Sequence, residues 1–198
     1  MKILVVDNYD SFTYNLLESF RLEKCELDVV YNSVSPKDIV IDQYDLLLLS
    51  PGPSRPENAG YLMEYIKAFK HKCPILGVCL GFQALVLEAG GTLGYLPTPV
   101  HGKISSIRTK QLHLFNDLPQ SIDVGRYHSI YAKHVPNEFH ITSETDDGIP
   151  MSIEHTSLPI YGVQFHPESI LSMKMNIGQK IVQNVLTAVR SRYVSDIA

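Results

Sequence analysis

The sequence predicts an α/β fold, in which a single domain carries an open, mostly parallel sheet with helices on both faces and an antiparallel excursion. Three observations support this prediction. Short apolar runs alternate with segments of helical periodicity over the first 90 residues, a pattern typical of a parallel sheet. Shorter alternating segments follow from about residue 102 to 164 and indicate antiparallel strands. One more strand and an amphipathic helix come last, and no internal repeat or linker divides residues 1–198.

The parallel strands are expected at four short runs of apolar residues, which lie at residues 2–7, 26–32, 44–50 and 73–78. Between them, apolar residues recur three and four positions apart, which predicts helices at residues 11–22, 58–70 and 80–91. Asp10 or Ser11 can cap the first helix, and Gly90 with Gly91 ends the third. The proline-rich turn that begins at Pro51 ends the third strand abruptly.

The second half of the chain has a different pattern. Antiparallel strands are expected at residues 103–108, 121–127, 139–144 and 149–155. The segment from Pro159 is expected to form one more strand, and Pro167 closes it because proline cannot donate to a strand ladder. The buried face of the final helix is marked by apolar residues four apart, namely Ile177, Ile181, Val185 and Val189.

The composition is that of an ordinary globular protein. Lysine and arginine number 17 against 21 aspartates and glutamates, and a formal net charge of −4 argues against nucleic-acid or anionic-membrane partners. Three cysteines do not make a disulfide framework and suit a reducing compartment; Cys25 and Cys73 are expected to be structural. No CxxC or HExxH spacing occurs, so we expect no metal site. Neither a signal-peptide core nor a membrane-length apolar run occurs, and we expect a cytoplasmic location.

The third cysteine, Cys79, lies in the segment GVCLGFQ at residues 77–83. A predicted strand ends here and a predicted helix begins, so Gly77-x-Cys79-x-Gly81 resembles the nucleophile elbow G-x-S-x-G with sulfur in place of oxygen. The helix N-terminus favours a thiolate, and the N–H of Leu80 would face a developing oxyanion. Because buried cysteines are common and mostly inert, the motif alone leaves a structural role equally open.

A cysteine nucleophile needs a base and a group that orients the base, and the segment FHPES offers His166 and Glu168. Strand alternation would place these two side chains on one face. Such a pair says little by itself and gains weight only together with the cysteine motif. His128 is the strongest rival base because it also ends a strand-like run, whereas His101 is expected in a loop. The other histidines are expected to be solvated, namely His71, His113, His134, His140 and His155.

Several segments together resemble one family. GVCLGFQ with GVQFHPES is similar to the class I, or triad-type, glutamine amidotransferases. VVDNYDSFTYN near the start, LSPGP ending at Pro53 and RYHSI from Arg126 narrow the resemblance to the glutaminase component of anthranilate synthase or aminodeoxychorismate synthase. The resemblance covers nearly the whole chain, and it implies a flavodoxin-like fold and no cofactor.

The resemblance also implies roles for individual residues. Cys79 would attack the side-chain amide of L-glutamine, His166 would transfer protons, and Glu168 would hold the imidazole. Gly52 and Leu80 would supply the N–H groups of an oxyanion hole. The other substrate-binding residues that the resemblance implies are Pro53, Ser54, Gln83, Ser129 and Ile130.

A partner is implied as well, because a glutaminase has little use for ammonia that escapes. The sequence carries no phosphate-binding loop or dinucleotide fingerprint, and the resemblance points to a chorismate-using synthase large subunit. Two other hypotheses stay open: a free-standing hydrolase of γ-glutamyl peptides or esters, and a non-catalytic regulatory subunit on the same fold. Ser54 stands where the family often has glycine, so the resemblance does not fix the conformation of this loop.

Overall fold

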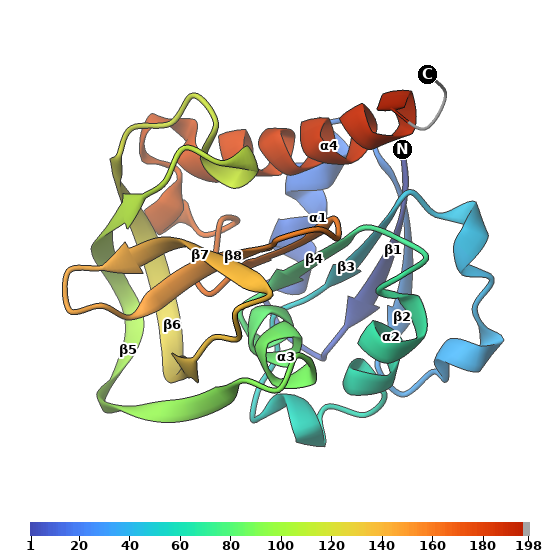
Figure 1. Cartoon of the computed structure of the whole chain (residues 1–198), viewed down its shortest axis with the longest axis horizontal. Helices are drawn as coiled ribbons and strands as arrows, with labels where there is room; N and C mark the ends of the chain where they lie inside the picture. The colour runs from blue at the N-terminus through green and yellow to red at the C-terminus, as the bar shows by residue number, and fades with distance from the viewer. Residues whose placement is uncertain (196–198) are drawn as a thin grey trace.

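The computed structural model describes residues 1–195, which form a sheet of nine strands in the order β2-β1-β3-β4-β9-β8-β7-β5-β6 (Figure 1). The first five strands in this order are parallel, and they are β2 (Glu26–Tyr31), β1 (Lys2–Asp7), β3 (Leu46–Leu49), β4 (Ile75–Val78) and β9 (Ile160–Val163). The other four pair antiparallel, and they are β8 (Pro150–His155), β7 (Phe139–Thr145), β5 (Thr92–Thr109) and β6 (Ser121–His134). The predicted fold class, a mostly parallel sheet with an antiparallel excursion, is confirmed.

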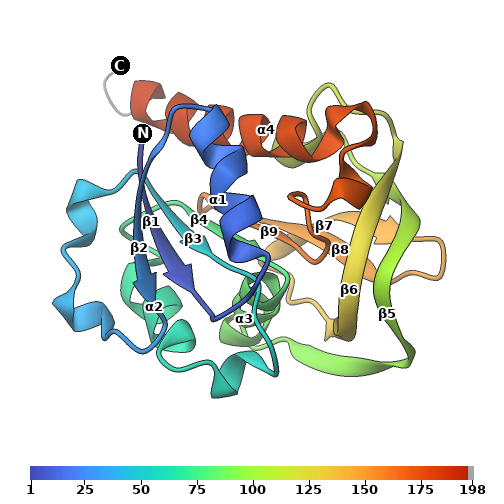
Figure 2. The same cartoon turned by 180° about the vertical axis from the view of Figure 1, so that it is seen from behind.

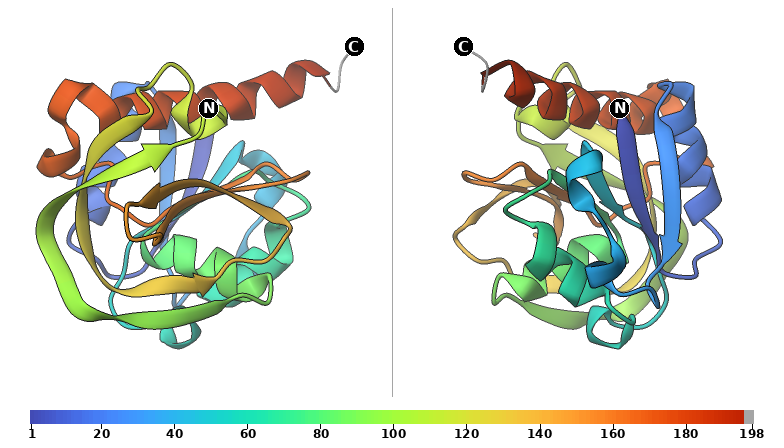
Figure 3. Two further views of the ribbon diagram at one scale, coloured as in Figure 1. Left: turned by 60° about the vertical axis from the view of Figure 1, so that its left-hand side comes forward. Right: turned by 90° about the vertical axis from the view of Figure 1, so that its right-hand side faces the viewer.

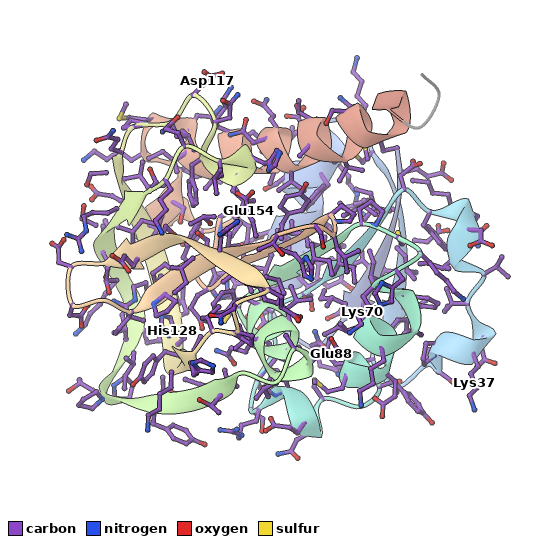
Figure 4. The ribbon with its side chains drawn as sticks, in the orientation of Figure 1. Lys37, Lys70, Glu88, Asp117, His128 and Glu154 are labelled. Carbon is purple, nitrogen blue, oxygen red and sulfur yellow. The ribbon has the colours of Figure 1, made fainter. Side chains whose placement is uncertain are left out.

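Two helices cover each face of the parallel strands. On one face lie α1 (Thr13–Leu22) and α4 (Ile177–Ser195), and on the other lie α2 (Leu62–Phe69) and α3 (Leu80–Glu88) (Figures 1 and 2). Side chains along each strand alternate between these two cores. Ile3 of β1 packs with the first pair of helices, and its neighbour Leu4 packs with the second. An ion pair of 3.0 Å between Lys70 and Glu88 joins the ends of α2 and α3 (Figure 4).

Two antiparallel strands, β5 and β6, are much longer than the sequence suggested, whereas β7 and β8 differ from the expected bounds by one residue. β5 and β6 form a long curved ribbon at the edge of the sheet (Figure 3), and His101, expected in a loop, lies within β5. The sequence suggests strand breaks at Pro97, Pro99 and Gly102. In the structure β5 continues through these residues, and its pairing with β6 shifts register between Tyr95 and Val100 and again after His101.

Two predicted helix starts are displaced. α1 begins at Thr13, and neither Asp10 nor Ser11 occupies the cap position; Asp10 instead accepts the N–H of Phe12 at 2.8 Å in the preceding turn. α2 begins at Leu62 rather than near residue 58, because Pro56–Asn58 form a separate 3₁₀ turn. The expected buried face of α4 is confirmed. Within residues 1–195, no helix combines the length and apolar character needed to span a membrane.

Candidate active site

Cys79 lies at a sharp turn between β4 and α3, as the motif predicts. Its backbone has φ +53° and ψ −96°, a conformation that costs an ordinary residue free energy and that is typical of strained nucleophile turns. The N–H of Cys79 donates to the carbonyl of Val163 at 2.8 Å, which fixes the turn to β9. A Cβ on Gly77 would lie 2.5 Å from the carbonyl carbon of Gly81, so the turn can close only around glycine.

Leu80 and Gly52, the expected oxyanion-hole residues, lie against each other. Leu80 is the first residue of α3, so its N–H has no partner within the helix. A Cβ added to Gly52 would lie 2.5 Å from a side-chain methyl of Leu80 and 2.6 Å from Cβ of Asn8. This close approach requires glycine at position 52 and brings the 50–53 loop to the beginning of α3.

The residues after β1 hold this loop in place. The backbone N–H of Asn8 donates to Oγ of Ser50 at 2.9 Å, and the Asn8 side-chain amide donates to the Ser50 carbonyl at 2.9 Å. Asn32 in turn donates to Oδ1 of Asn8 at 3.0 Å. Asn8 therefore positions the loop that carries Gly52, a role that the sequence did not reveal.

His166 and Glu168 form a buried pair, with 2.6 Å between His166 Nδ1 and Glu168 Oε1. The pair was expected on one face of a strand, and this part of the prediction is wrong. β9 ends at Val163, and both residues lie in the turn that follows. The turn is fixed by β6 and the next segment: the His166 N–H donates to the Gly125 carbonyl at 3.1 Å, and Oγ of Ser172 donates to the His166 carbonyl at 2.6 Å.

The surroundings of His166 favour its protonated form. Burial lowers the pKa of the imidazole, but hydrogen bonds and charge attraction from Cys79 and Glu168 outweigh burial and raise the pKa to about 11. Glu168 engages Nδ1 of the ring, which leaves Nε2 for an interaction with Cys79. Phe12 and Tyr127 enclose the ring, with centroid distances of 5.0 and 5.1 Å. An imidazolium held beside a sulfur in this enclosure can donate a proton to a leaving group.

The expected substrate-binding residues fall into two groups. Gln83 and Ile130 are buried, and the Gln83 side-chain amide donates to the Ile130 carbonyl at 3.1 Å; Ser129 precedes Ile130 on β6. Pro53 and Ser54 are exposed on the loop that follows Gly52. Ser54 has φ +68°, in the left-handed region that favours glycine, which gives a physical basis for the glycine that the resemblance associates with this position.

His128 is brought close to the site but is not available as a base. It lies inside β6 rather than at its end (Figure 4). Its Nε2 accepts from Arg126 Nε at 3.1 Å, and its Nδ1 donates to the Ile130 carbonyl at 2.9 Å. Burial and the neighbouring Arg126 charge lower the pKa of His128 to about 4, so the ring is neutral with both nitrogens engaged.

The other histidines are mostly exposed. Four of the five that were expected to be solvated are exposed, and His155 is half-buried and accepts backbone N–H groups of residues 157 and 158 at 3.0 Å. His101 packs edge-on against Tyr127, at a centroid distance of 5.2 Å.

The two remaining cysteines lie in the core, as expected. Burial raises the pKa of the Cys73 thiol to about 12, and it also raises that of Cys25. Both thiols are therefore held in the unreactive protonated form. Within residues 1–195, no three His, Cys, Asp or Glu side chains are grouped as a metal site would require.

Gln164 and the aromatic pair Phe12 and Tyr127 were missed. Gln164 is fully buried, and its side-chain amide nitrogen lies 3.7 Å from Cys79 Sγ. Its position two residues before His166 was a usable signal, because a polar side chain in an otherwise apolar segment needs a buried partner. Phe12 gave no signal, because an aromatic residue beside a helix start usually serves the core.

The glutamine amidotransferase class-I family profile matches residues 4–188 of the chain. The chain therefore belongs to the class I glutamine amidotransferases.

Named relatives are similar over nearly the whole chain. "Anthranilate synthase component II" of Haloarcula marismortui is 41% identical over 193 residues, covering 94% of this chain and 91% of the relative. "Anthranilate synthase component 2, pyocyanine specific" of Pseudomonas aeruginosa is 41% identical over 190 residues, covering 94% and 93%. Among solved structures, a Thermoplasma acidophilum protein described as a "putative gmp synthase subunit a protein" has a TM-score of 0.88 at 25% identity, covering 100% of this chain and 98% of that one.

Proposed function

We propose that this chain is the glutaminase subunit of anthranilate synthase, and that it hydrolyses L-glutamine to glutamate and ammonia through Cys79, His166 and Glu168. One observation carries the proposal: the cysteine at the strained turn lies close enough to His166 to raise the pKa of the imidazole, and Nδ1 of the same ring lies 2.6 Å from Glu168. The arrangement thereby brings together a nucleophile, a proton carrier and a carboxylate that orients the proton carrier.

The reaction follows from this geometry in two halves. The Cys79 thiolate attacks the carboxamide carbon of glutamine, and the N–H groups of Gly52 and Leu80 receive the negative charge that develops on oxygen. His166 gives its proton to the departing ammonia, which leaves a γ-glutamyl thioester on the sulfur. His166 then takes a proton from water as the water attacks the thioester carbonyl, and glutamate departs. Glu168 holds the imidazole through both halves.

The substrate would lie against the surfaces that Gln83 and the loop from Gly52 present. Backbone groups of Ser129 and Ile130 would hold the polar end of glutamine, and Pro53 and Ser54 would border the site. Gln83 and Ile130 are buried, Ser129 is partly buried, and Pro53 and Ser54 are exposed beyond Gly52. Cys79 follows the carboxyl end of β4, and α/β folds bind ligands at the carboxyl ends of their strands. No cofactor enters the reaction as proposed, and residues 1–198 act as one amidotransferase domain.

The ammonia would pass to a synthase large subunit that uses chorismate. The names of the relatives favour anthranilate as the product, since both relatives from Haloarcula and Pseudomonas are anthranilate synthase components. Aminodeoxychorismate is the alternative product from the same substrates. A cytoplasmic location, with no nucleic-acid or membrane partner, completes the proposal and agrees with the mildly acidic composition.

Two competing functions predict different behaviour. A free-standing γ-glutamyl hydrolase would release glutamate at full rate without any partner. A non-catalytic regulatory subunit would not react with a thiol-reactive glutamine analogue. The strained turn at Cys79 argues against the second, because a protein without chemistry has no need to hold that backbone conformation.

The test is to copurify the chain with its large subunit, then to supply the complex with chorismate and glutamine. We expect glutamate release together with anthranilate, and loss of both when Cys79 is replaced by alanine. Anthranilate formation from ammonium salts should survive that replacement. Aminodeoxychorismate as the product would change the proposed partner, and glutamine hydrolysis by Cys79→Ala at the wild-type rate would overturn the mechanism.

A further inference from the structure

Gln164 lies between the nucleophile and a row of buried polar groups. Its side chain has no exposed surface, and its Nε2 lies 3.7 Å from Cys79 Sγ. Its Oε1 accepts from Nε2 of Gln83 at 3.2 Å, and its backbone N–H donates to Met151 on β8 at 2.8 Å. The side chain is thus fixed at both ends and has one donor group directed at the sulfur.

The direction of each amide in this row follows from its neighbours. A backbone carbonyl can only accept, so the end of Gln83 that lies 3.1 Å from the Ile130 oxygen must be its NH₂ group. The same NH₂ group lies 3.2 Å from Gln164, so that end of Gln164 must be its oxygen. The NH₂ group of Gln164 must therefore face Cys79.

Arg126 and His128 fix the carbonyl on which this order depends. A guanidinium can only donate, so Nε2 of His128 must accept from Arg126, and the ring proton must be on Nδ1. This proton is donated to the Ile130 oxygen at 2.9 Å. The oxygen thus receives two N–H groups, one from His128 and one from Gln83, which fill both of its lone pairs.

We propose that Gln164 is a catalytic residue that donates an N–H to the sulfur of Cys79, and that Gln83, His128 and Arg126 are positioning residues that orient this donor. A hydrogen bond to a charged acceptor is stronger than one to a neutral acceptor, so it stabilises the thiolate more than the thiol. The bond forms with the attacking thiolate and forms again when the thiolate leaves the thioester. The inference rests on the proposed function for its place in the reaction.

Two other features of the described residues act on Cys79 besides Gln164. His166 interacts electrostatically with the cysteine and is itself paired with Glu168, and α3 begins at the next residue. His128 adds no charge because it is neutral. Loss of the Gln164 donor therefore removes one of the groups that favour the thiolate and leaves the others in place.

The test measures Cys79 itself and needs no glutamine. Iodoacetamide alkylation of Cys79, followed across pH by peptide mass spectrometry, should shift its midpoint upward by about one to two pH units in Gln164→Leu. Gln183→Leu is the matched control. The side chain of Gln183 lies on α4 and donates to Glu23 at 2.9 Å, so this variant should leave the midpoint unchanged. A Gln164→Leu midpoint equal to that of the control would overturn the proposal. Absence of glutaminase activity would overturn the proposed function, but the alkylation midpoint of Cys79 would still test this proposal.

A second measurement on the unaltered protein covers the case in which Gln164→Leu does not fold. The side-chain amide resonances of Gln164 should move over the pH range in which Cys79 becomes alkylatable, and they should not move after Cys79 is replaced by alanine. Gln164 amide resonances that do not move over this pH range would overturn the proposal.

The positioning role is tested by two replacements of His128. Asparagine keeps an N–H that can reach the Ile130 carbonyl, and leucine does not. His128→Leu should move the alkylation midpoint in the same direction as Gln164→Leu, by a smaller amount, and should raise KM for glutamine more than it lowers kcat. His128→Asn should restore most of the shift. Equal midpoints for asparagine and leucine would remove His128 from the row of positioning groups.

Discussion

The parallel and antiparallel halves of the sheet contribute to the site in different ways. In the parallel half, a short loop after each strand fixes the position of Cys79 and Gly52, and the residues involved are neighbours in sequence or lie on adjacent strands. In the antiparallel half, β6 presents Gly125 to Ser172 and Ile130 to Gln83, and each pair is 47 positions apart in sequence. The position of the proposed nucleophile is therefore set by local structure, whereas the proposed base and the proposed substrate-binding residues of β6 depend on how the two halves meet.

The largest expected effect is in the parallel half. Cys79→Ala should abolish glutamine-dependent synthesis by the complex, because no other described thiol reaches the site, and should leave ammonia-dependent synthesis intact. Product formation with each nitrogen source is the measurement. Cys25→Ala and Cys73→Ala are the controls, and both should retain glutamine-dependent activity because these thiols are buried in the core. Retained glutaminase in the Cys79 variant would mean that another group attacks the substrate.

The next largest effect is expected at His166, in the turn after β9, and it is compared with the effect at His128 in β6. His166→Ala should lower the glutaminase rate by on the order of 10³ or more, as removal of a triad member usually does. His128→Asn should lower it by about tenfold or less, because His128 positions a carbonyl and transfers no proton. Steady-state glutamate release distinguishes the two. A greater loss in the His128 variant would mean that His128, rather than His166, transfers the protons.

His128 should also affect how the free energy of unfolding depends on pH. Its pKa is about 4 in the folded protein against an ordinary value of 6.5, so the unfolded chain binds a proton between these pH values and the folded chain does not. Stability is therefore lost as pH falls from 6.5 to 4, by roughly 3 kcal/mol from this group.

Urea unfolding at several pH values measures the effect. The free energy of unfolding of the unaltered protein should fall more steeply over this range than that of His128→Gln, whereas replacement of the exposed His140 by glutamine should leave the slope unchanged. Parallel curves for His128→Gln and the unaltered protein would show that the folded protein does not hold His128 neutral.

The smallest expected effect is at Ser54 on the loop of the parallel half. Glycine adopts φ +68° without the steric cost that serine bears, so Ser54→Gly should raise the free energy of unfolding by about 0.5 to 1 kcal/mol. Ser157→Gly, at a position outside the left-handed region, should lower it. Urea unfolding of the two variants checks the prediction, and a decrease in both would mean that the Ser54 conformation is not strained.

The sequence predicted the parallel half well, because each strand and helix there has its own local pattern. Gly77 and Gly81 also indicated the turn at Cys79, since a tight turn restricts its residues to glycine. The length of β5 was not predictable from Pro97, Pro99 and Gly102, which usually end a strand and here fall at irregularities that pairing with β6 tolerates.

The pair of His166 and Glu168 was predicted from a strand that does not extend so far. Long-range contacts from Gly125 and Ser172 form the turn instead. The contact of Gln164 with the sulfur depends on Gln83 and Ile130, which lie far from it in sequence. Local patterns carry no information about such contacts, so this part of the site required the structure.

The central claim is that Cys79 carries the γ-glutamyl group during the reaction, and rapid acid quenching tests it most directly. The protein is mixed with glutamine, quenched during turnover, digested and analysed by mass spectrometry. We expect the peptide that contains Cys79 to gain the mass of one γ-glutamyl group, and Cys79→Ala to form no adduct and no glutamate. Glutamate formed at an undiminished rate by Cys79→Ala, or an adduct on another residue, would contradict the account.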